Sequence, residues 1–203
     1  MKAVFASNNP NKYRDMMVFT SMGELNLVAV EAVRSEFGLT EPPAPEEEFD
    51  SYFENARLKA DSFAEWAGMP ALADDSGLEV FALGGQPGVH SAYFAGPAAD
   101  HEANNRKLLG ELKGAEDRRA LFRSVLCLRV SPGEYLVAEG TVEGVITREP
   151  RGRSGWGYEP LFELPERQKT IAELRDEGAP LPSHRARAVE NLLELLRQIK
   201  GMA

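Results

Sequence analysis

The sequence predicts an α/β fold in which helices pack on a mixed β-sheet, and two patterns indicate it. In the first half of the chain, short apolar runs such as residues 2–6 and 25–30 alternate with helical patterns. Later, residues 120–130 and 135–147 are rich in Val, Leu and Ile and flank the sequence Ser-Pro-Gly-Glu, which is typical of an antiparallel hairpin. Alternating helices and strands followed by a hairpin favour a mixed sheet, in which the hairpin strands should be the longest.

The N-terminal elements are predicted to be a strand, a helix and a second strand. Residues 2–6 form an apolar strand that ends in polar residues. A helix should follow, because Asn9 can cap it, Pro10 suits its first position and Gly23 stands where a helix ends. Its apolar face would consist of Tyr13, Met16, Met17 and Thr20. Residues 25–30 are expected to form the second strand.

The middle of the chain is predicted to contain a loop, a helix and two short strands. Residues 41–48 hold three prolines and four acidic residues, which excludes a regular element. The sequence Ser-x-x-Glu at residues 51–54 resembles a capping box and opens a helical pattern that ends at Gly68. Residues 71–73 and 78–83 resemble short buried strands, and the sequence Asp-Asp-Ser-Gly between them predicts a turn.

Two further helices are predicted in the second half of the chain. Asp100 is placed to cap a helix that runs to Leu112. The last helix has Ser183 as its cap and should end before Gly201. Its apolar stripe consists of Val189, Leu192, Leu193, Leu196 and Ile199.

Composition and charge exclude several classes of protein. The chain has 203 residues, of which 43% are hydrophobic and 27% charged, so we expect one folded domain and exclude disordered and fibrous proteins. A net charge of −9 argues against a nucleic acid polymer as partner. Cys127 is the only cysteine, which suits a reducing, cytoplasmic location. The apolar start is too short for a signal peptide, and the uncharged residues 80–99 are too rich in Gly and Pro to span a membrane.

The first candidate site is a polar turn after the first strand. Its residues are Ser7, Asn8, Asn9, Pro10, Asn11 and Lys12. A strand that ends in small polar residues and turns into a helix started by proline presents free backbone N–H groups to an anion. Lys12 in the first helical turn opposes the helix dipole, and a bound phosphate would compensate for it. A solvated capping turn explains this stretch equally well.

The second candidate is Lys59, which lies on the apolar face of its predicted helix together with Tyr52, Ala56 and Phe63. Lysine is almost never buried without a partner. Its side chain therefore either passes its neighbours to reach water or points into a cleft.

The third candidate is the pair Asp74 and Asp75, followed by Ser76. Two adjacent carboxylates at the end of a strand suit a Mg²⁺ ion shared with substrate phosphates, although the same residue types are common in turns. Because neighbouring residues of an extended chain face opposite ways, one carboxylate should reach the site while the other anchors the turn. The acidic loop with Glu47 is placed to supply a further carboxylate, or it is simply solvated.

The fourth candidate is a glycine-rich segment with two aromatic residues, followed later by a histidine and an arginine. The segment covers residues 152–160 and includes Trp156 and Tyr158. A large flat side chain on a flexible loop suits stacking on a planar ring, and the alternative is a hydrophobic plug that closes the hairpin. His184 and Arg185 at a helix start can donate to a carbonyl or a phosphate, or they form a solvated first turn.

Together and in this order, these segments resemble the inosine triphosphate pyrophosphatase family, which removes deaminated purine nucleoside triphosphates from the nucleotide pool. The resemblance runs from residue 1 to about residue 196. The motifs are Ser7-x-Asn9-x-x-Lys12, Phe53-Glu54-Asn55-Ala56 with Lys59-Ala60, Ala73-Asp74-Asp75-Ser76-Gly77-Leu78, Gly84-Gly85-Gln86-Pro87-Gly88-Val89-His90-Ser91-Ala92, Gly144-Val145-Ile146, Gly155-Trp156-Gly157-Tyr158 with Pro160, Thr170-x-Ala172-Glu173-Leu174, and Ser183-His184-Arg185.

The resemblance implies a two-lobed α/β fold around a long mixed sheet with flanking helices, a substrate cleft between the lobes, and a homodimer. It also implies Mg²⁺-dependent hydrolysis of ITP, dITP and XTP at the α–β phosphoanhydride. The products would be a nucleoside monophosphate and pyrophosphate. The expected partner is therefore a purine nucleoside triphosphate, and no membrane or nucleic acid polymer.

The resemblance also implies roles for individual residues. Asp75 would bind metal and activate water as the base, with Glu47 and Asp74 as further metal ligands, and Lys12 and Lys59 would take part in catalysis by holding the phosphates. The substrate-binding residues would be Ser7, Asn8, Asn9, Pro10, Asn11, Lys12, Ser76, Trp156, Gly157, Tyr158, Glu159, His184 and Arg185. Trp156 would stack on the purine, while His184 and Arg185 would read its O6 carbonyl.

Two departures from the family pattern concern the base. Glu159 stands where the family usually has an aspartate, and Ala179 stands where it usually has a lysine, for which Arg175 is a candidate replacement. One alternative is therefore a related pyrophosphatase with another preferred base, such as a modified pyrimidine. A nucleotide sensor without turnover is a second alternative, which an intact Asp75 and Lys59 argue against. A purely structural protein would not explain Lys59 or the tryptophan between glycines.

Overall fold

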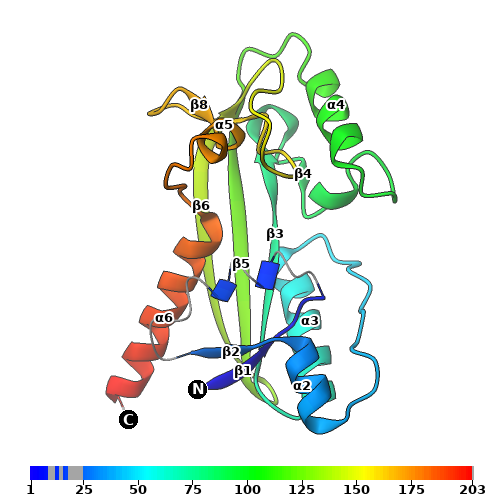
Figure 1. Cartoon of the computed structure of the whole chain (residues 1–203), viewed down its shortest axis with the longest axis vertical. Coiled ribbons are helices and arrows are strands. Elements are labelled where there is room, and N and C mark those ends of the chain that lie inside the picture. Colours follow the sequence, from blue (N-terminus) through cyan, green and yellow to red (C-terminus); the bar gives the residue numbers. More distant parts are fainter. Residues whose placement is uncertain (9–11, 14–15, 18–24, 203) are drawn as a thin grey trace. The chain divides into compact units, whose positions relative to one another are not determined.

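The computed structural model describes residues 1–8, 12–13, 16–17 and 25–202, and it confirms the α/β class (Figure 1). The elements are β1 (Lys2–Phe5), β2 (Asn26–Val28), α2 (Val30–Phe37), α3 (Tyr52–Ala67), β3 (Ala71–Val80), the 3₁₀ helix η1 (Phe81–Leu83), β4 (Pro87–Gly88), the 3₁₀ helix η2 (Ser91–Tyr93), α4 (His101–Glu111), β5 (Arg119–Ser131), β6 (Glu134–Ile146), β7 (Phe162–Leu164), β8 (Lys169–Thr170), α5 (Ile171–Asp176) and α6 (His184–Met202). The strands form one sheet in the order β2-β1-β3-β5-β6-β7-β8, and β4 pairs with β3.

The chain divides into two compact units, each of which is described by itself. Unit 1 comprises Met1–Asp75, Ser124–Gly140 and His184–Ala203. Unit 2 comprises Ser76–Arg123 and Thr141–Ser183. The division falls within β3, β5 and β6, so these strands contribute residues to both units.

The strands of unit 1 are covered by helices on both faces. β1 pairs in parallel with β2 and with β3, which confirms part of the mixed sheet. Successive residues of these strands alternate between two hydrophobic clusters, as the period of a strand requires. Phe5 and Leu72 pack in a cluster with α6, whereas Val4 and Ala71 pack in another with Phe63 of α3. Figure 1 shows α6 on one side of these strands and α2 and α3 on the other.

The predicted turn at Asp74–Gly77 is wrong, because β3 runs without interruption from Ala71 to Val80. Aspartate is depleted in strands since its side chain competes for backbone hydrogen bonds and tolerates burial poorly. Here each of the two aspartates has charged partners, described below, which remove that cost. Residues 81–83, predicted as the end of a strand, form η1 instead.

Helix α2 was not predicted, and Val30 begins this helix instead of ending the second strand. Its N-cap is Ala29, which makes no side-chain capping hydrogen bond, so the usual sequence signal for a helix start is missing. Only Val30 and Val33 of the helix are buried, which leaves a weak apolar stripe. The helix ends at Gly38 in the left-handed conformation.

The other long elements confirm their predictions. The loop at residues 41–48 contains no helix or strand, and α3 follows with Ser51 as its N-cap, accepting a hydrogen bond from the Glu54 N–H at 3.4 Å. Asp100 caps α4 by accepting from the N–H groups of Glu102 and Ala103. β5 and β6 are the longest strands described and are joined by the predicted tight turn. Of the predicted helix near the N-terminus, Lys12, Tyr13, Met16 and Met17 are helical, whereas Asn9, Pro10, Thr20 and Gly23 lie outside the described residues.

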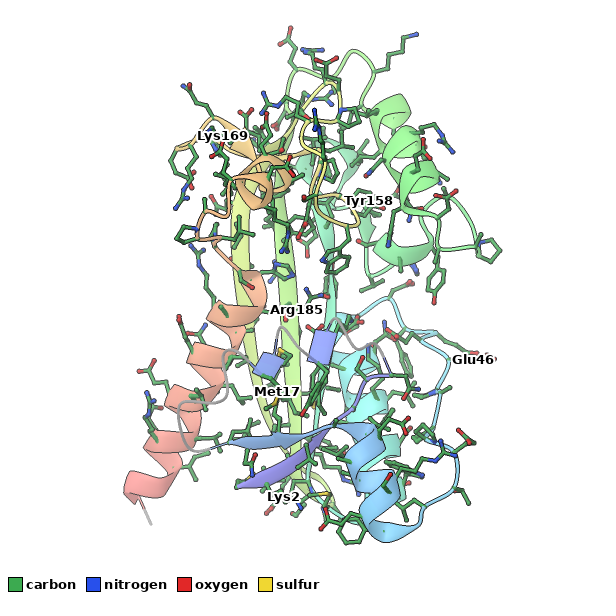
Figure 2. All side chains as sticks on the ribbon, in the orientation of Figure 1. Lys2, Met17, Glu46, Tyr158, Lys169 and Arg185 are labelled. Atoms are coloured by element: carbon green, nitrogen blue, oxygen red, sulfur yellow. The ribbon has the colours of Figure 1, made fainter. Side chains whose placement is uncertain are left out.

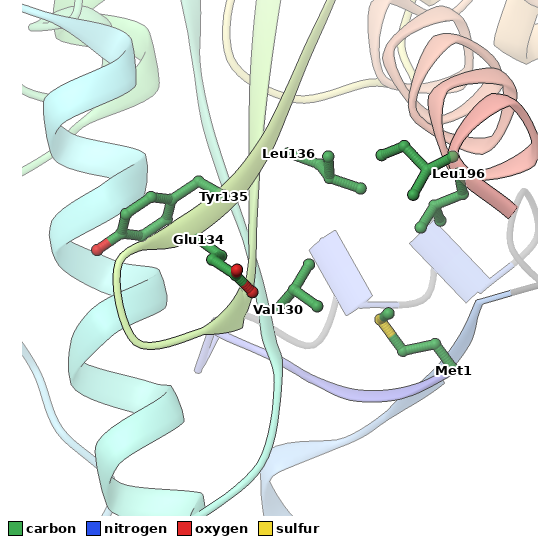
Figure 3. A pocket seen from close by; sticks show the side chains of 7 residues that line it. Met1, Val130, Glu134, Tyr135, Leu136 and Leu196 are labelled. Carbon is green, nitrogen blue, oxygen red and sulfur yellow. The ribbon is translucent and has the colours of Figure 1, made fainter. Parts of the chain in front are cut away.

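Helix α6 confirms the last predicted helix but extends past Gly201 to Met202. Its predicted apolar stripe is buried except for Ile199, which is 49% exposed. Ile199 and its buried neighbour Leu196 border an apolar hollow of about 330 Å³ (Figure 3). The hollow is lined by Met1, Val130, Glu134, Tyr135, Leu136, Leu196 and Ile199, none of which is a predicted site residue. No helix in the described part of the chain is long and apolar enough to cross a membrane.

Candidate active site

The two aspartates of β3 have separate sets of partners, as expected for neighbours on a strand. Asp74 contacts Ser124 of β5 and Arg185 of α6, whereas Asp75 contacts Lys59 of α3. The helices α6 and α3 cover opposite faces of these strands. The prediction that the two carboxylates face opposite ways is confirmed.

Asp74 is a buried anion surrounded by donors. Its Oδ1 accepts a hydrogen bond of 2.6 Å from Ser124 Oγ, and its Oδ2 accepts one of 3.1 Å from Arg185 Nε. Lys12 Nζ lies 3.2 Å from the same Oδ2. Burial alone would raise the pKa of Asp74, but the charges of Lys12 and Arg185 and the Ser124 hydroxyl hold it well below its usual range. Asp74 is therefore ionised at physiological pH and fixes the positions of two cations.

Asp75 and Glu47 share one ammonium group. Lys59 Nζ lies 2.9 Å from Asp75 Oδ1 and 2.9 Å from Glu47 Oε2. Because both oxygens contact the same nitrogen, the two carboxylates converge on one point. Lys59 is only 8% exposed, so the interpretation that its side chain reaches past its neighbours to water is wrong. The Lys59 side chain is instead buried with the Asp75 and Glu47 carboxylates as partners, and its pointing into a cleft stays a prediction.

Asn55, one helical turn before Lys59, connects α3 to the acidic loop. Its Nδ2 donates to the Phe49 carbonyl at 2.9 Å, and its Oδ1 accepts from the Phe49 N–H at 3.1 Å. The same Nδ2 lies 3.5 Å from Asp75 Oδ2. Asn55 therefore anchors the chain two residues after Glu47, which holds that carboxylate near Asp75.

The protonation of Asp75 suits proton transfer near neutral pH. Burial raises the pKa of Asp75 to about 7, and the neighbouring Glu47 carboxylate acts in the same direction against the opposing charge of Lys59. Burial alone would lower the pKa of Lys59, but Asp75 and Glu47 raise it above its usual value, so the ammonium persists. A carboxylate whose pKa lies near the operating pH is matched to the work of a general base.

Asp75 and Glu47 also have the chemistry of a magnesium site. Mg²⁺ is commonly held by one or two carboxylates together with substrate phosphates, and these two carboxylates are close neighbours. Within the described ranges, no group of three or more His, Cys, Asp and Glu residues is arranged to hold a metal. The two carboxylates fit a metal that takes its remaining ligands from a phosphate substrate and water. Asp74, by contrast, directs its oxygens at Ser124, Arg185 and Lys12.

The start of α6 is part of the site, and Figure 2 shows Arg185 in its first turn. Arg185 is 4% exposed and bound to Asp74, so a solvated first turn is excluded as its explanation. Burial lowers the pKa of His184 to about 3, and the Arg185 charge acts in the same direction. His184 is therefore neutral at physiological pH, with one donor and one acceptor nitrogen in its ring.

Gly140 of β6 permits this close approach of α6. A Cβ atom at this position would overlap the His184 carbonyl oxygen and the Ala188 N–H nitrogen. Next to it, Asn191 Nδ2 donates to the Glu139 carbonyl at 2.8 Å and holds the helix against the strand. Any side chain at position 140 would push the first turns of α6 away from β6.

We therefore expect Gly140→Ala to lower the free energy of unfolding by about 1–3 kcal/mol, as overpacking does. Arg185 and Asp74 should also separate, because the first turn of α6 carries Arg185. Urea unfolding monitored by circular dichroism measures the loss. Gly110→Ala in α4 is the matched control, since a Cβ there meets nothing within 4 Å. That control should raise stability by about 0.5–1 kcal/mol, and an equal response of both variants would contradict the overlap at Gly140.

The remaining predicted residues are distributed as follows. Ser7 and Asn8 precede the part of the turn that is not described, and Asn9, Pro10 and Asn11 lie outside the described residues. Lys12, Glu47, Lys59, Asp74, Asp75, His184 and Arg185 belong to unit 1. Ser76, Trp156, Gly157, Tyr158 and Glu159 belong to unit 2. The expected substrate cleft between lobes stays a prediction.

In unit 2, the aromatic segment separates into a buried and an exposed residue. Tyr158 is 5% exposed, and its hydroxyl donates to the Ser91 carbonyl at 2.8 Å (Figure 2). Trp156 is 40% exposed, so it is not a hydrophobic plug. The Glu159 carboxylate contacts Arg175 through two bonds of 2.7 Å. Arg175 was suggested as a replacement for the missing lysine. Its guanidinium is bound to the Glu159 carboxylate of the same segment.

Three residues of the site were missed in the sequence. Ser124 is the one whose signal was present, because a hydroxyl stands within the apolar strand at residues 120–130. Asn55 belongs to a quoted motif but was given no role. The role of Gly140 depends on the approach of a helix that is distant in sequence, so no local pattern reveals it.

Comparison with known proteins finds close relatives over nearly the whole chain. The sequence matches the Ham1 family over residues 3–195. A dITP/XTP pyrophosphatase from Exiguobacterium sp. is 43% identical over 202 residues, which are 99% of this chain and 100% of the relative. Another from Thermus thermophilus is 45% identical over 196 residues, covering 96% and 91% of the two chains. The solved structure of a HAM1 protein from Coxiella burnetii superimposes with a TM-score of 0.84 at 37% identity, covering 98% and 99%.

Proposed function

Because the chain belongs to the Ham1 family, we propose that it hydrolyses deaminated purine nucleoside triphosphates, namely ITP, dITP and XTP. The bond cleaved is the α–β phosphoanhydride, and the products are a nucleoside monophosphate and pyrophosphate. The observation that carries the proposal is the buried Asp75 carboxylate, held by Lys59 beside a second carboxylate from Glu47. A protein that only bound nucleotide would have no use for a proton acceptor poised in this way.

In this mechanism Asp75 accepts a proton from the attacking water. The water oxygen forms a bond to phosphorus while the bridging P–O bond breaks, and the pyrophosphate group leaves. Phosphoryl transfer depends mainly on positioning and on neutralising charge, so cations beside the base are required. Lys59 supplies one, and Lys12 supplies another, since Asp74 holds its ammonium at 3.2 Å while the side chain stays partly exposed.

We propose that the reaction depends on Mg²⁺, with Asp75 and Glu47 as its protein ligands. When bound, the ion neutralises phosphate charge and orients the water. The adjacency of the two carboxylates, each of which acts on the pKa of the other, supports this assignment. A homodimer and a cytoplasmic location rest on the family resemblance, and the single buried cysteine suits a reducing compartment.

The decisive experiment measures pyrophosphate release from ITP, dITP, XTP and the four standard dNTPs, with Mg²⁺ or with excess EDTA. Mg²⁺-dependent release from ITP, dITP and XTP alone would support the proposal. Equal release from the standard nucleotides would instead indicate a pyrophosphatase with another base preference. Nucleotide binding without release would favour a sensor.

Trp156 is expected to stack on the base of the substrate. Truncation in Trp156→Ala should raise KM for ITP about fivefold to a hundredfold with a smaller change in kcat, since stacking contributes about 1–3 kcal/mol per base. Steady-state kinetics with ITP measure the change. Trp66→Phe is the control for loss of a tryptophan, because Trp66 belongs to unit 1 and packs on Phe63. An unchanged KM in Trp156→Ala would remove Trp156 from the binding site.

A further inference from the structure

The loop that carries Trp156 is held in place by side chains, although its composition is that of a flexible segment. We call residues 152–157 the tryptophan loop. It contains three glycines, and five of its six residues are exposed, including Trp156 at 40%. A loop of this composition would normally lose much conformational entropy when it binds a ligand.

The C-terminal end of α5 holds the first half of the tryptophan loop. Asp176 accepts two hydrogen bonds from consecutive backbone N–H groups, from Arg153 at 2.8 Å and from Ser154 at 2.9 Å. The hydrogen bonds from Ser154 and from the Arg153 N–H lower the pKa of Asp176, as expected for a carboxylate that accepts from the chain. Both oxygens of this carboxylate are therefore used to fix the loop backbone.

The neighbouring residue of α5 holds the second half through an intermediate carboxylate. Arg175 donates from Nε and Nη2 to the two oxygens of Glu159, at 2.7 Å each. Glu159 Oε2 in turn accepts from the Trp156 N–H at 3.2 Å. Glu159 is only 9% exposed, and a buried carboxylate bound by two nitrogens of one guanidinium has a fixed orientation. The backbone of Trp156 itself is thus fixed.

Two further contacts complete the arrangement. Asn105 of α4 donates from Nδ2 to the Gly157 carbonyl at 3.0 Å. Gly152, with φ of 89°, lies so close to α5 that a Cβ would stand 2.6 Å from the Ala172 carbonyl carbon. The main chain of Arg153, Ser154, Trp156 and Gly157 is therefore held by hydrogen bonds. Gly152 and Gly155 approach neighbouring atoms too closely to accept a side chain.

We propose that Asp176, Arg175 and Glu159 are positioning residues that hold Trp156 as a preformed stacking surface for the planar base of the substrate. This inference rests on the proposed function. Fixing a loop before binding removes the entropy of ordering it from the binding step, which strengthens binding without any new contact. Glu159 consequently acts through Arg175 and the Trp156 backbone and does not read the base directly.

The first test measures the mobility of Trp156 in the absence of substrate. The chain has two tryptophans, so a Trp66→Phe background leaves Trp156 as the only indole reporter. Asp176→Ala should lower the fluorescence anisotropy of Trp156 and raise its quenching by acrylamide. Glu177→Ala is the matched control, because Glu177 is the next residue, equally charged, and pairs with Lys169 instead of the loop.

The second test measures kinetics with ITP. Asp176→Ala and Glu159→Gln should each raise KM at least about threefold with little change in kcat, but by no more than Trp156→Ala does. Adding Asp176→Ala to Trp156→Ala should leave KM unchanged, because a positioning residue has nothing to position once the indole is removed. A residue with a general structural role would instead add its full effect to that of Trp156→Ala.

The outcomes separate this inference from the proposed function. If Asp176→Ala and Glu177→Ala give the same anisotropy, or if the KM effects of Asp176→Ala and Trp156→Ala add, the positioning role is overturned. If the unmodified protein releases no pyrophosphate from any deaminated purine nucleotide, the proposed function fails, whereas the anisotropy measurement still reports whether α5 holds the loop.

Discussion

Asp75→Asn is expected to lower kcat for pyrophosphate release about 100-fold to 10,000-fold, the range that a positioned general base contributes. The amide keeps the shape of the side chain but cannot accept a proton from water. It also withdraws one of the two carboxylates assigned to Mg²⁺. Quenched-flow or coupled pyrophosphate assays with ITP measure the loss.

The same variant is expected to remain folded. The pKa of Asp75 rises from about 3.9 in the unfolded chain to about 7 in the folded one, so the stabilisation from its neutral form is present below pH 4. That stabilisation is lost as the pH rises through 7, and a neutral amide does not suffer this loss. Lys59 keeps Glu47 as its partner. Glu48→Gln in the same acidic loop is the control, and near-normal turnover in Asp75→Asn would refute the assignment of the base.

Asp74→Asn is expected to have the largest effect on stability, lowering the free energy of unfolding by about 3–5 kcal/mol at pH 7. The reason is that Arg185, which is 4% exposed, would remain buried without its anion, and Lys12 would lose the same partner. Urea unfolding at several pH values measures the change. Glu116→Gln, at an exposed position, is the control and should leave the midpoint unchanged.

The loss of stability in Asp74→Asn should depend on pH. Because the folded protein holds the pKa of Asp74 below its usual range, the carboxylate stabilises the fold above the unfolded pKa of about 3.9. This contribution is lost as the pH falls toward the folded pKa. The difference between Asp74→Asn and the unmodified protein should therefore be full above about pH 5 and should shrink below pH 4. A difference that is independent of pH would contradict the role of the charge.

Elements with a local signal could be predicted from the sequence. Helix α4 has Asp100 as a side-chain cap, and β5 and β6 combine long apolar strands with a turn that suits a hairpin. Helix α2 lacks such a cap, and its formation depends on burying Val30 and Val33 against the sheet. β3 was divided in two because Asp74 and Asp75 resemble turn residues until their distant cations are known.

In the candidate site, too, local patterns revealed some residues, whereas partners distant in the sequence could not be predicted. Lys59 was identified because a charged residue on an apolar helix face is costly unless it has a partner, which is a conclusion available from periodicity alone. Periodicity does not reveal the partners of Lys59, because Glu47 and Asp75 come from a loop and a strand on either side of α3 in the sequence. Arg185 resembled a solvated residue for the same reason: its anion lies 111 positions earlier in the chain.

Because side chains alternate between the two faces along β3, the site depends on the number of residues that precede the two aspartates in this strand. The pairing of Val4 with Ala71 fixes which face each later residue of β3 meets. Inserting or deleting a single residue between Ala71 and Asp74 would turn both aspartates to the opposite face of the sheet. A deletion would place Asp75 beside Arg185, and an insertion would place Asp74 beside Lys59. A two-residue change would keep the faces but displace the carboxylates along the strand. We therefore expect tolerated length changes in homologous chains to fall outside this stretch, and loop transplants in engineered variants to succeed only where they leave it intact.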